Sequence, residues 1–327
     1  MTAKVKLIAV LSAIVLLTLA GLVTGAIGAS LTAGEGNEAK PLLAEPLPHI
    51  PPQKVFVSSN PSEADHHGEE GHGGGASGVL TSDDAGTFAV TNTLLSSWIV
   101  TLFLIALFYG ATRRMAVVPR GLQNLMETAV EALLNFVQSV AGAENARRFF
   151  PLIATIFMFV MFNAWIGLLP IYPTLGFINA DGEMERHLLR PAGTDLNMPM
   201  ALALVSFVFV EFWGFRLLKL SYLGKFIRLE NLRKGNFAQV PIDLFVGALE
   251  LLSEFVRIIS FTFRLFGNMT AGEILLLVIT YLVPFVLVLP FYGLELLVGM
   301  VQALIFAGLT LVFVVVAVTP HSEEEHS

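Results

Sequence analysis

The chain has 327 residues, of which 55% are hydrophobic and only 14% are charged, and its mean hydropathy is +0.73. Because an ordinary globular domain has about 25% charged residues, this composition argues against a soluble enzyme, a nucleic-acid-binding protein and a disordered scaffold. The sequence contains no cysteine, which excludes disulfides, thiolate metal sites and cysteine nucleophiles. The net charge of −7 becomes informative only when the charges are placed along the chain. We therefore predict an all-α polytopic membrane protein.

A membrane-spanning helix needs about 20 mostly apolar residues to cross a hydrocarbon layer about 30 Å thick. Apolar runs of this kind occupy five parts of the chain: residues 7–30, 92–110, 149–172, 196–218 and 242–319. The last run has enough residues for two or three crossings. With the first run set aside as a signal peptide or an extra helix, we expect about five core membrane helices.

The segment 122–142 has a different pattern. Its apolar residues recur at helical spacing, while Glu127, Glu131 and Gln138 lie on the opposite side. Such a helix has one apolar and one polar face, which is typical of a helix that lies at the membrane surface or packs against other helices. We predict an amphipathic helix here rather than a membrane span.

The N-terminal run allows two interpretations. Lys4 and Lys6 precede an apolar stretch that ends in Gly-Ala-Ile-Gly-Ala-Ser at residues 25–30, which resembles a signal peptide with cleavage near Ala29. The run is also long enough to remain as a transmembrane helix, in which Gly21 and Gly25 form a small-xxx-small pair. Residues 1–30 are therefore either a signal peptide or an N-terminal transmembrane helix.

Residues 31–91 are rich in Gly, Pro, Ser and acidic residues, which predicts a low-complexity linker. A cluster within it could bind zinc or nickel: His66, His67, Glu69, Glu70 and His72. A solvated linker is the simpler interpretation of this composition, so we predict no metal site.

The basic residues predict the orientation. Eleven of the 19 Lys and Arg residues lie in the loops 111–148 and 216–240, which are therefore cytoplasmic by the positive-inside rule. The linker 31–91 has only Lys40 and Lys54 against nine acidic residues and is expected to be external. This alternation places the acidic tail, residues 320–327, in the cytoplasm.

Charged residues interrupt the longest apolar run, where each costs about 2.5–3.5 kcal/mol on insertion scales. Steps of three or four residues place six side chains on one face of a helix: Glu250, Glu254, Arg257, Phe261, Arg264 and Asn268. Further along, Glu295 and Gln302 are seven residues apart and also share a face. Two interpretations remain open near the start of the run. Either Glu254 or Glu250 pairs with Arg257 and locks helices together, or these residues line a polar path.

Arg264 carries the strongest functional signal. An arginine cannot lose its charge through a shift in pKa, and this one lies among Phe261, Phe263, Leu265 and Phe266. A permanent cation at this depth needs an anion, water or both. The sequence therefore predicts a polar path through the membrane with one fixed positive charge in it.

The stretch 260–273 reads Ser-Phe-Thr-Phe-Arg-Leu-Phe-Gly-Asn-Met-Thr-Ala-Gly-Glu. It resembles the signature helix of subunit a of F-type ATP synthases, and a motif of this length is far more specific than a short isolated pattern. Residues 190–197, Arg-Pro-Ala-Gly-Thr-Asp-Leu-Asn, resemble another part of that family, as do Asn163, Pro170 and Gln302. The resemblance covers most of residues 92–319 and leaves residues 1–91 outside it.

The resemblance implies a non-catalytic stator subunit without cofactor or metal. Two long, strongly tilted helices, separated by a break near Pro284 and Pro290, would lie against a ring of c subunits. Two aqueous half-channels would pass protons to and from the ring carboxylates and so couple the proton gradient to ATP synthesis. The implied partners are the c-ring, the subunit b peripheral stalk, the remaining ATP synthase subunits and membrane lipid, with no nucleic acid. The implied location is the bacterial plasma (inner) membrane.

The resemblance also assigns proton translocation to nine residues: Arg264, Asn268, Glu273, Glu295, Gln302, Glu250, Ser253, Asp195 and Asn197. Arg264 matches the essential arginine of the family, and Asn268 and Gln302 match its polar neighbours. Glu273 and Glu295 match positions that line the external half-channel, where a carboxyl group can accept and donate protons.

Two further pairs match positions at the ends of the path. Glu250, with Ser253 as its companion, matches an acidic position near the internal exit. Asp195 and Asn197 match polar residues near the external mouth. The resemblance gives no role to Arg257 or Glu211.

Two other classes of function compete with this one. An ion-coupled secondary transporter could use Arg264 to bind an anionic substrate, and it would work without partners. An intramembrane enzyme is disfavoured because the membrane segments contain neither a His-Glu-x-x-His motif nor a Gly-x-Ser-x-Gly motif. Both H⁺ and Na⁺ fit as the coupling ion, because the family's ion site lies mainly on the ring subunit.

Overall fold

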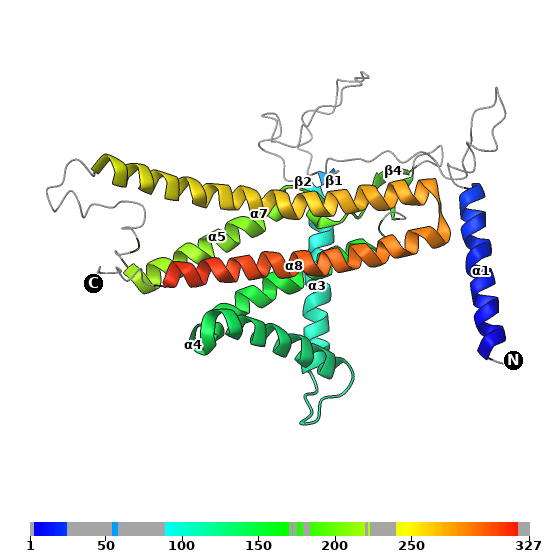
Figure 1. Ribbon diagram of the computed structural model, residues 1–327, viewed down its shortest axis with the longest axis horizontal. Helices are drawn as coiled ribbons and strands as arrows, with labels where there is room; N and C mark the ends of the chain where they lie inside the picture. The colour runs from blue at the N-terminus through cyan, green and yellow to red at the C-terminus, as the bar shows by residue number, and fades with distance from the viewer. Residues whose placement is uncertain are drawn as a thin grey trace, which may run out of the picture. The chain divides into compact units, whose positions relative to one another are not determined.

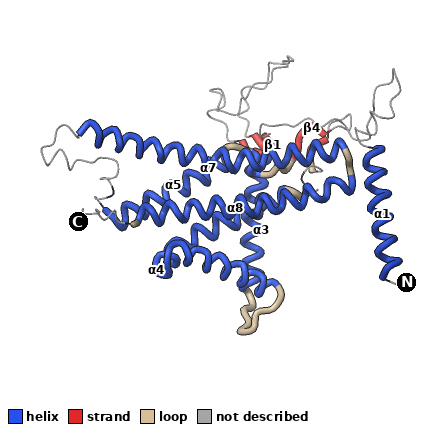
Figure 2. The backbone as a smooth tube through the Cα atoms, viewed as in Figure 1, coloured by secondary structure: helices blue, strands red, loops and turns tan. Residues whose placement is uncertain are grey.

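The structure is a computed structural model that describes residues 3–24, 54–57, 89–169, 172, 175–178, 184–219, 222 and 240–319. Helices dominate these residues, as Figure 2 shows. The long helices are α1 (Ala3–Thr24), α3 (Asn92–Thr112), α4 (Leu122–Gly167), α5 (Asn197–Leu218), α7 (Val240–Leu282) and α8 (Val288–Val318). Two single turns, η2 (Ala192–Thr194) and η4 (Phe285–Leu287), complete the helical elements. The all-α class is confirmed.

Four of these segments are long and apolar enough to cross a membrane: Asn92–Thr112, Leu122–Gly167, Asn197–Leu218 and Phe285–Val318. They agree with the spans predicted in the same parts of the chain, so the chain is a polytopic membrane protein. α7 contains six charged residues among its 43. At about 1.5 Å per residue it is about 65 Å long, roughly twice the thickness of the hydrocarbon layer.

α4 consists of two helical parts that meet at Gly142. This residue has φ 75° and ψ 161°, a combination that glycine alone adopts without strain. Before the break, Met126 and Leu133 are buried while Glu127 and Glu131 are exposed. The predicted amphipathic helix is therefore present, and it ends where the sequence pattern indicated.

The predicted break between the two long helices is also present. α7 ends at Leu282, and Pro284, which has no backbone N–H, precedes the turn η4. α8 then begins at Val288, and Figure 1 shows the two helices joined by this short connection. Pro290 lies in the first turn of α8, where its missing N–H would have no partner within the helix.

Two short antiparallel strand pairs accompany the helices. β1 (Lys54–Val57) pairs with β2 (Ala89–Thr91), and β3 (Gly176–Ile178) pairs with β4 (Met184–His187). The sequence analysis predicted neither pair, because strands of three or four residues are too short to show a recognisable alternation of apolar and polar residues. Most of the linker 31–91, including its histidine cluster, and the tail 320–327 lie outside the described residues.

The chain divides into two compact units. Unit 1 consists of residues 1–96, 164–194 and 267–300, and unit 2 of residues 97–163, 195–266 and 301–327. α7 and α8 each contribute residues to both units.

The core of unit 2 is aromatic. Phe149 of α4 packs edge to face on Trp213 of α5, with ring centroids 5.4 Å apart. Phe261 of α7 lies 4.9 Å from Phe306 of α8, measured between ring centroids. The Ser206 hydroxyl of α5 and the Thr310 hydroxyl of α8 share a 2.7 Å hydrogen bond. Thr310 already donates to the Phe306 carbonyl oxygen, so Ser206 is the donor between the two hydroxyls.

Unit 1 depends on close packing at glycines. A Cβ atom added to Gly299 of α8 would lie 2.7 Å from the Ala164 Cβ atom of α4. The neighbouring Trp165 indole donates a 2.9 Å hydrogen bond to the Leu296 carbonyl oxygen. The last turns of α4 are therefore fixed against α8. α1 contacts the turn η4, where Gly21 approaches the Pro284 carbonyl group.

Candidate functional site

A buried carboxylate in unit 1 depends on a glycine. Glu295 of α8 is only 8% exposed, and its carboxylate occupies the space in which a Cβ atom of Gly272 would stand. Gly272 belongs to α7, so the absence of a side chain there lets a carboxylate lie between two packed helices. No hydrogen bond or ion pair of Glu295 is present among the residues that the structure describes.

The residue after Gly272 is also acidic, but its surroundings differ. The Glu273 carboxylate accepts a hydrogen bond from the Arg190 guanidinium, with 2.9 Å between Nη2 and Oε2. The Arg190 side chain is 10% exposed and the Glu273 side chain 28%. The pair is therefore mostly removed from solvent. The two predicted carboxylates lie in the same unit; Glu295 has no ionic partner within the described part of the chain, whereas Glu273 is bound to a cation.

A cluster of buried polar residues surrounds the backbone of Arg190. Its N–H donates to the Ser96 hydroxyl of α3 at 3.2 Å. One turn earlier on α3, the Asn92 amide donates to the His187 carbonyl oxygen at 3.4 Å. Tyr172 is buried nearby, and its burial raises the pKa of the phenol while its hydrogen bond with Ser96 opposes this. These contacts hold the segment before α5 against the start of α3.

Arg264 lies on α7 in unit 2 and is half-buried. Its guanidinium reaches the Ser260 hydroxyl at 3.5 Å and lies 5.9 Å from the centroid of the Phe261 ring. Within the described part of the chain it forms no salt bridge. A guanidinium carries a permanent charge and five N–H donors, so most of its capacity to bind an anion remains available.

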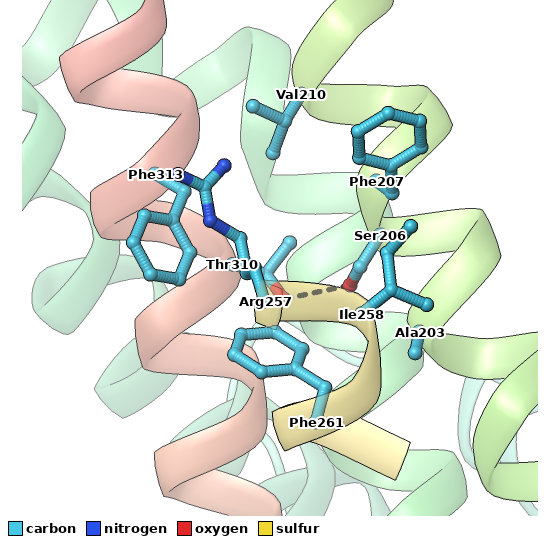
Figure 3. A pocket seen from close by; sticks show the side chains of 9 residues that line it. All are labelled: Ala203, Ser206, Phe207, Val210, Arg257, Ile258, Phe261, Thr310 and Phe313. Atoms are coloured by element: carbon cyan, nitrogen blue, oxygen red, sulfur yellow. Dashed lines mark hydrogen bonds between the residues drawn. The ribbon is translucent and has the colours of Figure 1, made fainter. Parts of the chain in front are cut away.

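A second arginine on α7 is fully engaged. Arg257 forms a 2.6 Å ion pair with Glu254, whose side chain is 3% exposed, and its guanidinium carbon lies 3.8 Å from the centroid of the Phe313 ring. Figure 3 shows Arg257 beside Phe313, in a small pocket that Phe261 also lines. The predicted pairing of Glu254 with Arg257 is confirmed. Arg257 therefore contributes to packing, in contrast to Arg264.

Tyr222, which follows α5 in the chain, lies in unit 2 and packs against α5. Its ring packs where a Cβ atom of Gly214 would stand, and its hydroxyl donates to the Glu211 carboxylate at 3.1 Å. Burial raises the pKa of Tyr222, and the nearby negative charge of Glu211 raises it further. The phenol therefore stays protonated at physiological pH, so its hydrogen bond to Glu211 is retained.

The other predicted site residues are distributed over both units. In unit 2, Glu250 is half-buried, Gln302 is buried, and the exposed Ser253 donates to the Leu249 carbonyl oxygen at 2.9 Å. Asn268, on α7 in unit 1, is exposed.

Asp195 is buried, and one of its carboxylate oxygens accepts a 3.0 Å hydrogen bond from the Asn197 backbone N–H. This contact satisfies a free amide group at the start of α5. Asp195 thus stabilises the start of α5, in addition to any role in ion transfer.

Two residues of the site were not predicted from the sequence. Gly272 was recognised only as part of the Ala-Gly-Glu motif, although a glycine inside a long helix costs about 1 kcal/mol relative to alanine and is therefore a signal of close packing. Arg190 was quoted within residues 190–197 without a role. Its position before Pro191 gave no indication that it would reach α7.

The comparisons with known proteins show which family the chain belongs to. The sequence profile of a family described as ATP synthase A chain matches residues 94–315, more than half of the chain. The chain belongs to this family. A protein named ATP synthase subunit a from Gloeobacter violaceus is 34% identical over 231 residues, which cover 71% of this chain and 85% of the relative. One of the same name from a Geobacter species is 32% identical over 235 residues, covering 72% of this chain and 89% of the relative.

Family membership has direct consequences. The chain is a non-catalytic membrane subunit of the F0 sector, and it belongs to a proton-translocating stator. The match includes Arg264, Glu273 and Glu295, and it ends close to the end of α8.

Proposed function

We propose that the chain forms the stator side of two aqueous half-channels that pass protons to and from the carboxylates of a c-ring. The observation that carries this proposal is Arg264. It is a half-buried guanidinium on the long helix α7, it has no acidic partner among the described residues, and it lies within the matched family region. A ring carboxylate arriving from outside the chain would supply the missing anion.

Arg264 would set the point at which each proton is released. A ring carboxylate travels through lipid in its protonated form, because an ionised group would be costly there. Beside a guanidinium the ionised form is favoured, so the proton leaves. The fixed cation also repels a hydronium ion, which prevents a direct passage between the two half-channels. Asn268 and Gln302 would be the polar neighbours of this point.

The remaining predicted residues would line the two half-channels. Glu273 and Glu295 would line the external half, with Asp195 and Asn197 near its mouth. Glu250 and Ser253 would lie near the internal exit. A proton that crosses 100 mV releases about 2.3 kcal/mol, so several protons must pass for each ATP.

The lengths of α7 and α8 favour a tilted arrangement. At about 65 Å, α7 is too long to stand upright in a bilayer about 30 Å thick, because more than half of its length would then lie outside the hydrocarbon. We infer that α7 and α8 run obliquely along the ring in a bacterial plasma membrane. The basic loops and the C-terminus would face the cytoplasm and the linker 31–91 the outside, and the subunit b stalk would be a further partner.

Purification followed by reconstitution tests this function. Solubilised in mild detergent, the chain is expected to co-purify with a c-ring, subunit b and a soluble ATPase head. Vesicles with this assembly should acidify when ATP is added. Recovery of the chain alone, together with ion-coupled uptake of an anionic solute by vesicles that contain nothing else, would instead show a secondary transporter.

The packing at Gly272 leads to a second expectation. Gly272→Ala places a methyl group where the Glu295 carboxylate lies, so we expect the rate of ATP-driven acidification per assembled complex to fall at least severalfold. Gly293→Ala is the matched control, because a Cβ atom there meets nothing within 4 Å, and Ala is favoured over Gly in a helix by about 1 kcal/mol. Equal rates for the two variants would show that the Glu295 carboxylate does not depend on this space.

A further inference from the structure

The two carboxylates of unit 1 differ in their ionic surroundings. Glu273 is bonded to Arg190 at 2.9 Å, whereas Glu295 is buried and has no hydrogen bond or ion pair among the residues that the structure describes. A buried charge is costly unless it is paired. An ionised Glu273 therefore has its compensating charge already in place, while Glu295 can lose its uncompensated charge by binding a proton.

The cation of this pair is held in position by the fold. The Arg190 N–H bonds the Ser96 hydroxyl, and the next residue, Pro191, lies where a Cβ atom of Gly167 would stand, at 2.8 Å from it. Three residues on, Gly193 is packed equally closely against Met269 of α7. The segment from 190 to 193 is thus fixed between α3, α4 and α7, so Arg190 is not a mobile surface side chain that meets Glu273 by chance.

We propose that Arg190 is a positioning residue that keeps Glu273 ionised as a fixed counter-ion, so that the transferred proton is carried by Glu295 and not by Glu273. This inference rests on the proposed function and divides the work between the two carboxylates. A hydronium ion on the external side transfers a proton to a Glu295 oxygen, which forms an O–H bond, and leaves a water molecule behind. The proton then passes to an ionised ring carboxylate, and Glu295 returns to its charged form. Glu273 gains and loses no proton in this cycle.

The proposal is tested by neutralising Arg190 alone, Glu273 alone and then both residues together. The variants are Arg190→Gln, Glu273→Gln and the double variant, studied in the complete complex. Passive proton conduction is measured in vesicles stripped of the soluble head and is divided by the amount of assembled complex. The matched control is Glu144→Gln with Arg148→Gln, which removes an ion pair at 3.2 Å whose side chains are 84% and 41% exposed.

Each single variant is expected to lower conduction about tenfold or more, because it removes one charge of an ion pair that is mostly shielded from solvent and leaves the other charge of that pair in place. The double variant should return to within about threefold of the unaltered protein, since it removes both charges of the pair. Arg190→Lys, which keeps the cation but not its planar fork, should also conduct well. The exposed control pair should have no effect, as exposed pairs contribute little.

A double variant that conducts as poorly as Glu273→Gln, or that fails to assemble, would overturn the proposal, because Glu273 would then act beyond its pairing with Arg190. Failure of the proposed function has a different signature. In that case Glu295→Gln would conduct like the unaltered protein, and Arg264→Ala would still support ATP-driven acidification in the complete complex, whatever the result for Arg190 and Glu273.

Discussion

Replacing Arg264 with alanine is expected to abolish ATP-driven acidification of vesicles that contain the assembled complex. Among the described residues, Arg264 forms no salt bridge, whereas Arg257 on the same helix is paired with Glu254. The variant therefore removes a positive charge that could receive an anion from outside the chain. Without it, nothing favours the ionised form of an arriving carboxylate over the protonated one. Protons could also pass between the half-channels without turning a rotor, so vesicles stripped of the soluble head should leak protons.

Arg264→Lys separates charge from geometry. A lysine keeps the positive charge, but it is a compact ammonium group without the planar fork of five donors. We expect acidification to be largely lost here too, which would show that the shape of the guanidinium matters. Arg148→Ala, at an exposed position of α4, is the control for the loss of an arginine as such. Normal acidification by Arg264→Ala would contradict the proposed function.

Glu295→Gln is expected to slow proton transport strongly while leaving it coupled to ATP hydrolysis. Glutamine has almost the same size and shape, so it fits against Gly272, but it cannot take up and release a proton. Positioned acid–base groups typically raise a rate by about 10²–10⁴-fold. Water in the half-channel would still carry some protons past the glutamine, so the loss of rate should be smaller than this. We expect a reduction of about tenfold or more.

Two rates are measured on the same vesicles. Acidification and ATP hydrolysis are followed together, and both should fall in proportion if coupling is intact. Glu295→Asp keeps a carboxyl group on a shorter side chain and should retain more activity than Glu295→Gln. An unchanged rate for Glu295→Gln would remove this residue from the proton path.

The fold could be predicted well from the sequence because a bilayer imposes simple rules. Runs of apolar residues gave the spans, and the proline at 284 gave the break between α7 and α8. The end of the amphipathic helix coincided with Gly142. Each of these signals is local in the sequence, since it depends on composition, periodicity or the chemistry of one residue.

The site was predicted less completely, because its contacts join distant segments. The spacing of Glu254 and Arg257 placed them on one helical face, and they do form an ion pair. Arg190 and Glu273 are 83 residues apart, and no periodicity links them. The environment of Glu295 depends on Gly272 of another helix. The sequence shows a glutamate at both positions, so it could not reveal that Glu295 and Glu273 have different surroundings.

The corner at Gly142 also indicates how deep α4 lies. Backbone groups freed where a helix is interrupted need water or lipid headgroups, because the hydrocarbon cannot bond them. Glu144 and Arg148, just beyond the corner, are exposed and bonded to each other, as charged side chains at a headgroup layer would be. The corner and these charges would thus share the headgroup layer, and the part of α4 that enters the acyl chains would begin only after Arg148.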